Sequence, residues 1–173
     1  MALSEKQVTN VRDVSEILAN YAIDREDLKG VIAALPDDQG INTVTLDYEL
    51  QLLKIISVGW SISVHMDGRE QKTALSETFW HTINEFSKNV SEMSYLTIGQ
   101  KIDYFELLKK RLDTYIRSLE TAEKGSDPAA CIGTTFATCC KDVDNPFVAI
   151  TGSRIFTMAI QGVKEYLGTI TIQ

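Results

Sequence analysis

The chain has two histidines, His65 and His81, whose neighbours include side chains that could take part in catalysis or metal binding. His81 lies in a series of charged residues. Glu77, His81 and Glu85 are spaced four residues apart, so a helix would place them on one face. A carboxylate beside an imidazole can raise its pKa or orient it for metal binding. Lys88 continues the same row, and such alternation of charge is typical of a solvated helix face. We therefore interpret this row as exposed surface.

The second histidine, His65, closes a long apolar segment. A histidine in that position can ligate haem iron or titrate near neutral pH, and it can equally serve as a helix C-terminal residue that the helix dipole favours. Trp60, Met66 and Met158 could complete an apolar pocket around it. The predicted ligand-binding residues are therefore Trp60, His65, Met66 and Met158.

The three cysteines, Cys131, Cys139 and Cys140, do not have the spacing of a zinc site, which usually needs four recognisable ligands. Adjacent cysteines rarely bridge each other, because disulfide geometry resists it. We interpret all three as reduced thiols that fill space in a core, which indicates a cytoplasmic protein. Neither a metal site nor a cofactor is predicted.

Two glycine-containing stretches superficially suggest phosphate binding, Gly133-Thr134-Thr135 and Thr151-Gly152-Ser153-Arg154. Neither matches a P-loop or a dinucleotide-binding fingerprint, and a helix start or bend explains both. With two histidines and many serines, a catalytic triad can always be drawn on paper, so none is argued. We predict no catalytic residue, while an active site assembled from scattered residues stays open.

Composition limits the remaining classes of function. The chain has 173 residues, a formal net charge of −7, 44% apolar residues and 24% charged residues. These values fit one soluble globular domain over residues 1–173 that needs no disulfide or metal to fold. An acidic chain repels the phosphates of nucleic acid, so a nucleic-acid partner is not expected. No apolar run is long enough to span a membrane.

Hydrophobic periodicity at helical spacing predicts an all-α fold, a compact single-domain bundle of about seven helices. The N-terminal helix opens at Ser4, where Gln7 three residues later has the form of a capping box. A second such box predicts a helix start at Thr97 with Gln100. The predicted helices cover residues 4–21, 24–35, 46–66, 73–93, 97–125, 128–139 and 146–168, with residues 41–44 as a linker and a possible break near Gly152.

The segment near 46–66 is expected to be the central helix. Its apolar side chains point in nearly every direction, and only Asp47, Lys54, Ser61 and His65 form a narrow polar stripe. A helix that is apolar on most sides belongs inside a bundle. Trp60 is therefore expected to be largely buried there.

These observations favour a non-enzymatic helical interaction or regulatory module, which binds a protein partner or self-associates. The alternative is a sensor or carrier domain that binds an apolar small molecule or haem in a cavity beside the central helix. An enzyme is the least favoured of the three classes, because no catalytic constellation is recognisable.

Overall fold

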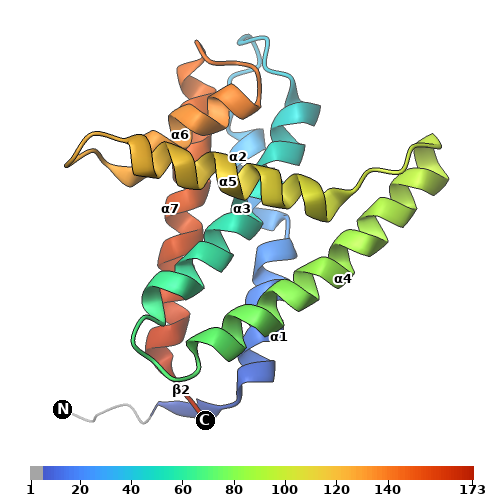
Figure 1. The fold of residues 1–173 in the computed structure, drawn as a ribbon. Helices are drawn as coiled ribbons and strands as arrows, with labels where there is room; N and C mark the ends of the chain where they lie inside the picture. Colours follow the sequence, from blue (N-terminus) through green and yellow to red (C-terminus); the bar gives the residue numbers. More distant parts are fainter. Residues whose placement is uncertain (1–5) are drawn as a thin grey trace.

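The computed structural model describes residues 6–173 and confirms the predicted all-α bundle (Figure 1). Helices make up most of this part of the chain, and two three-residue strands flank them. The elements are β1 (Gln7–Thr9), α1 (Val11–Ile23), α2 (Glu26–Ala33), α3 (Thr43–His65), α4 (Lys72–Ile98), α5 (Tyr104–Thr121), α6 (Pro128–Cys139), α7 (Pro146–Thr169) and β2 (Ile170–Ile172).

Side-chain caps explain where most of the helices begin. An asparagine or aspartate at the N-cap accepts a hydrogen bond from a backbone N–H of the first turn, which satisfies a donor that the helix itself cannot pair. The Asp127-Pro128 and Asn145-Pro146 pairs add a proline at the first helical position, as the sequence predicted. The capping residues are Asn10, Asn42, Asp103, Asp127 and Asn145.

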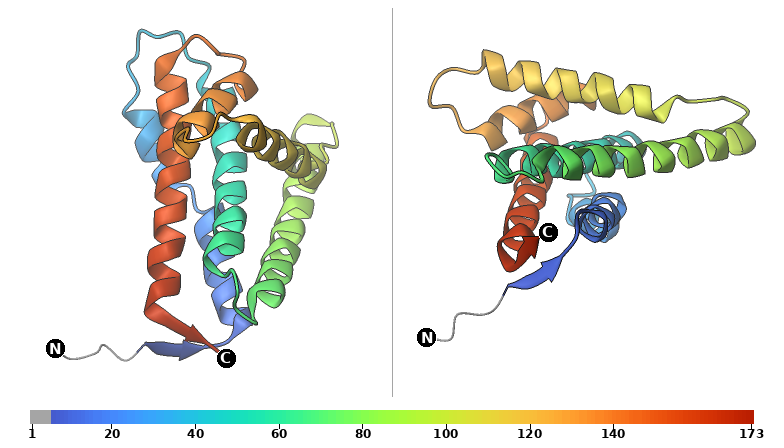
Figure 2. Two further views of the ribbon diagram at one scale, coloured as in Figure 1. Left: turned by 60° about the vertical axis from the view of Figure 1, so that its left-hand side comes forward. Right: turned by 60° about the horizontal axis from the view of Figure 1, so that its bottom comes forward.

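The predicted central helix is α3, and it is confirmed. Its buried residues point to all sides, and α1, α4, α5 and α7 all pack against it. α7 runs beside it, while α5 crosses it together with α6 (Figures 1 and 2). Even the stripe expected to be polar is partly enclosed, because Lys54 and Ser61 are buried.

α4 lies against α1 and α3 along its first half and then leaves the bundle. Figure 2 shows its C-terminal end and the following turn extending beyond the other helices. Gly99 ends this helix with a φ of 70°, a left-handed conformation that glycine adopts without steric cost. The chain then returns into α5, whose first residues pack back on α4.

Two predicted helix starts were wrong. Val8, expected on the first helix, lies in β1, which pairs in parallel with β2 so that Gln7 is opposite Ile170. The helix begins only at Val11 because Asn10 caps it, and Ser4 lies outside the described residues. Thr97 does not open a helix either, since it belongs to the last turn of α4.

Two further details of the predicted elements differ from the structure. α7 continues through Gly152 without a break. The expected linker over residues 41–44 is shorter, because Asn42 caps α3 and the helix begins at Thr43.

Candidate functional site

The four residues predicted to bind a ligand do not line a common cavity. Trp60 is half-buried on α3 and packs against Phe156 of α7, with ring centroids 5.6 Å apart. Met66, the C-cap of α3, is fully buried, whereas Met158 is exposed on the outer side of α7. His65 ends α3, near Lys164. Each of the four therefore has its own surroundings.

The cavity beside Trp60 is small. Its volume is about 10 Å³, which is at the lower limit for holding a single water molecule. The hydroxyl of Tyr115, which borders it, is buried and has no hydrogen-bond partner within residues 6–173. The remaining walls are Leu53, Ile56, Ser57, Leu112, Ile116, Leu119, Ile132 and Phe156.

The surroundings of His65 disfavour its protonation. Burial lowers the pKa of its imidazole, and the nearby Lys164 ammonium lowers it further. Its Nε2 atom is buried and finds no hydrogen-bond partner in the part of the chain that the structure describes. Protonation would place a charge in this enclosed position, close to another cation.

The row formed by Glu77, His81 and Glu85 is exposed on α4, as expected. Glu85 accepts a hydrogen bond of 2.6 Å from Lys88, and this contact lowers the pKa of the Glu85 carboxyl group. Within residues 6–173, no three His, Cys, Asp or Glu side chains are grouped so that they could hold a metal ion.

The three cysteines are half-buried between helices. Burial raises the pKa of the Cys139 thiol and raises that of Cys140 to about 12. Cys131 lies 3.3 Å from the hydroxyl oxygen of Ser118. A thiol with a raised pKa is a poor nucleophile and metal ligand, because the thiolate is the reactive form.

The glycine-containing stretches serve helix packing. Gly133 lies inside α6 and Gly152 inside α7. A Cβ added at Gly133 would lie 2.4 Å from the carbonyl oxygen of Ala149, and one at Gly152 would lie 2.6 Å from the Phe136 ring. The glycines therefore let the two helices approach closely, and neither stretch forms a phosphate-binding turn.

A polar hollow of about 490 Å³ lies between the loop before α3 and the loop after α6. Two of its polar side chains take part in capping the neighbouring helices. Asn42 accepts from the Thr45 N–H as the cap of α3, and Asp142 accepts from the side chain of Asn145, the cap of α7. Helix capping therefore accounts for this arrangement.

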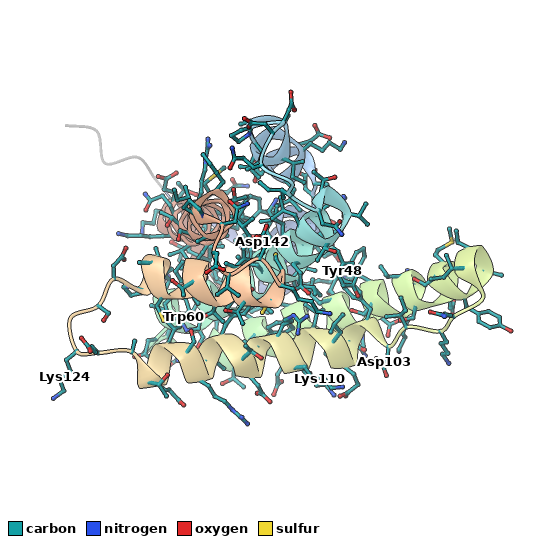
Figure 3. The ribbon with its side chains drawn as sticks, turned by 90° about the horizontal axis from the view of Figure 1, so that it is seen from above. Tyr48, Trp60, Asp103, Lys110, Lys124 and Asp142 are labelled. Atoms are coloured by element: carbon teal, nitrogen blue, oxygen red, sulfur yellow. The ribbon has the colours of Figure 1, made fainter. Side chains whose placement is uncertain are left out.

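The projecting end of α4 carries the most exposed group of large apolar side chains. Met93, Tyr95, Leu96 and Ile98, which we call the α4 tip, are exposed to between 59 and 77%. At 100° per residue, these four side chains point in four directions around the helix. In Figure 3, Asp103 marks the beginning of α5, and α4 continues beyond it, away from the other helices. The end of α4 therefore exposes apolar side chains on several sides, with the small polar side chains of Ser94 and Thr97 between them.

A shallow apolar groove runs between α1 and α7. The α1–α7 groove has a volume of about 200 Å³ and is lined by Ile17, Leu18, Tyr21, Gly162 and Tyr166, all uncharged. The side chain of Tyr21 reaches across from α1 to α7, where its hydroxyl donates to the Met158 carbonyl at 3.3 Å. Burial raises the pKa of both tyrosines, and nearby carboxylates raise it further.

Sequence reasoning missed both surfaces. Met93 and Ile98 each continue an apolar pattern at helical spacing, which is typical of a core face, yet both are exposed because the bundle ends before the helix does. A usable signal was present, since no charged residue occurs from Met93 to Gln100. The α1–α7 groove had no such signal, because it depends on how two distant helices are placed.

Comparisons of the chain with protein-family models, with curated proteins and with solved structures found no match. Of the helices in the described part of the chain, none combines the length and the apolar composition needed to cross a bilayer.

Proposed function

We propose that this chain is a non-enzymatic helical interaction module that binds a protein partner through the α4 tip. The observation that carries the proposal is the uncovered last turn of α4. Groups of large apolar side chains are normally buried, and an exposed group often marks a protein interaction site. Binding to a partner surface would bury these apolar side chains.

Burial of the α4 tip would contribute favourable free energy to binding. Removing a Leu, Ile or Met side chain from water contributes about 1.5–3 kcal/mol. Tyr95 adds an aromatic ring with a polar hydroxyl, a side chain that is enriched at protein interfaces. Because association itself costs free energy, the tip suits a partner with an apolar surface that covers its side chains.

The titratable groups of the molecule support a non-enzymatic function. General acid–base catalysis works best with a pKa near the operating pH, at a position within reach of substrate. The pKa of Cys140 is raised to about 12, and His65 is enclosed beside Lys164. None of the polar groups at the α4 tip pairs a nucleophile with a base.

Site-specific photo-crosslinking in cells tests this proposal. A benzophenone amino acid replaces Leu96, and in the control it replaces Val44, which is 79% exposed at the start of α3. The expected result is a protein adduct of defined mass from position 96 and none from position 44. The crosslinked protein, once identified by mass spectrometry and purified, should bind the parent and not Leu96→Glu. Equal or absent crosslinking from the two positions would contradict the proposal.

The second candidate is a carrier of an apolar small molecule, and the α1–α7 groove favours it. Pockets for drug-sized ligands usually measure about 300–1,000 Å³, so a groove of about 200 Å³ suits only a small ligand. Native mass spectrometry of freshly purified protein, together with its absorption spectrum, would detect a bound molecule or a haem band. A mass equal to that of the bare chain and no visible absorption would count against this candidate.

A further inference from the structure

We propose that the α4 tip of one molecule inserts into the α1–α7 groove of a second copy of this chain. The inference rests on the proposed function in one respect, namely that the α4 tip is a binding surface. It adds the identity of the partner and the surface that receives the tip.

The two surfaces match in chemistry. The tip presents Met93, Leu96 and Ile98, and the groove offers aliphatic and aromatic side chains without a charged group. A volume of about 200 Å³ is too small for a large cofactor but suits one or two inserted side chains. Partly exposed Ile17, at 48%, forms the rim on α1 and would be covered by the insertion.

Charge favours this contact over others between two copies. Each molecule carries a net charge of −7, so most pairs of surfaces would bring like charges together. Both the tip and the groove are uncharged and avoid that repulsion. Lys101 follows the tip. Near the groove lie three carboxylates, Asp13 beside Tyr166 and both Asp27 and Asp24 beside Tyr21. Glu92, which precedes the tip, is the one carboxylate that borders it on α4.

The shape of the molecule makes the contact intermolecular. α4 has 27 residues, so it is about 40 Å long, and its first half packs on α1. The tip lies at the far end of α4, away from the bundle, and cannot fold back to the groove of its own molecule (Figures 1 and 2). Each copy therefore offers one tip and one groove, a head-to-tail arrangement that forms a ring or an open chain of molecules.

Complementation between two variants tests this arrangement. Leu96→Glu disables the tip and leaves the groove, while Ile17→Glu disables the groove and leaves the tip. Val44→Glu places the same charge at an exposed apolar residue on neither surface. Sedimentation velocity and light scattering give the mass of each sample over a wide range of concentration, and circular dichroism confirms that each variant is folded. Ile17→Gln replaces Ile17→Glu if the charged variant unfolds.

The expected result has four parts. The parent and Val44→Glu form species larger than one chain as concentration rises, and each groove or tip variant remains at 19.3 kDa. An equal mixture of the two disabled variants forms dimers and nothing larger, because only one tip and one groove remain active. If Ile17→Glu associates like the parent, or the mixture stays monomeric, the inference is wrong. A parent that is monomeric at every concentration also overturns it, while the crosslink at position 96 to a different protein would still support the proposed function.

Discussion

The carboxylate of Glu49 on α3 accepts two hydrogen bonds from the guanidinium group of Arg111 on α5, at 2.8 and 2.6 Å. Glu49 is almost completely buried, and the pairing raises the pKa of Arg111. Two parallel hydrogen bonds fix both distance and orientation, so this pair sets how α5 crosses the central helix.

Arg111→Ala is expected to lower the free energy of unfolding by about 3 kcal/mol, because it leaves the carboxylate of Glu49 buried and unpaired. Urea unfolding followed by circular dichroism measures the loss. Arg117→Ala, at an exposed position of the same helix, should change stability by less than about 0.5 kcal/mol. Replacing both Glu49 and Arg111 with leucine should lower the free energy of unfolding by less than Arg111→Ala alone does. A larger loss in the double variant would contradict the explanation.

Gly133→Ala and Gly30→Ala should shift stability in opposite directions. At Gly133 the new Cβ would meet the Ala149 carbonyl oxygen at 2.4 Å, so α6 and α7 must separate, at a cost of about 1–3 kcal/mol. At Gly30, inside α2, a Cβ meets nothing within 4 Å, and alanine should stabilise the helix by about 0.5–1 kcal/mol. Thermal unfolding of each variant beside the parent shows whether the melting temperature rises or falls. Destabilisation by Gly30→Ala would show that α2 is packed differently.

Trp60→Ala is expected to lower the free energy of unfolding by about 3 kcal/mol, because it removes the ring that packs against Phe156. The mass of the assembled species should stay the same as that of the parent, since Trp60 belongs to neither the α4 tip nor the α1–α7 groove. Denaturant unfolding and light scattering on one preparation separate the two effects. A changed mass with little loss of stability would instead place Trp60 in an interface.

His65 should make stability depend on pH near neutrality. In the unfolded chain its imidazole takes up a proton near its ordinary pKa of 6.5, whereas in the fold its pKa is lower. Between these two pKa values the unfolded state binds more protons, so stability is full above about pH 6.5 and falls as the pH decreases through that value. We expect the melting temperature to drop more between about pH 8 and about pH 5.5 in the parent than in His65→Gln. His81→Gln, at an exposed position of α4, controls for the loss of a histidine and should behave like the parent.

Much of the helical framework was predictable because it depends on local signals. Asp127-Pro128 and Asn145-Pro146 act through neighbouring backbone groups, and both begin helices as expected. The central helix was also predictable, since apolar side chains on all sides of a helix require burial on all sides. These features depend on the residue and its near neighbours along the chain.

The face that α5 buries was not predictable in the same way. The apolar spacing in this part of the sequence, taken alone, favours a buried stripe through Ile116, with Lys109 at one of its positions. In the structure the buried residues are Tyr104, Leu108 and Tyr115, and Lys109 is exposed and paired with Glu106. The buried face instead follows Arg111, whose partner Glu49 is 62 residues away, and no local pattern reports such a pair.

The α4 tip was partly predictable from the sequence, whereas the α1–α7 groove was not. The charge-free run from Met93 to Gln100 is visible in the sequence, but its exposure depends on where the bundle ends. The α1–α7 groove joins side chains that are about 140 residues apart along the chain, so only the folded arrangement of both helices reveals it.

The pairing of β1 with β2 has a consequence for the order in which this chain folds. Val8 lies opposite Thr171, so forming the pair closes a loop of nearly the whole described chain. Closing a flexible loop of that length costs about 4–5 kcal/mol, and two strands of three residues contribute little of their own. The strands can therefore join only after the helices have brought both ends together. In hydrogen exchange, the amides of this strand pair should open first, well before those at the middle of α3.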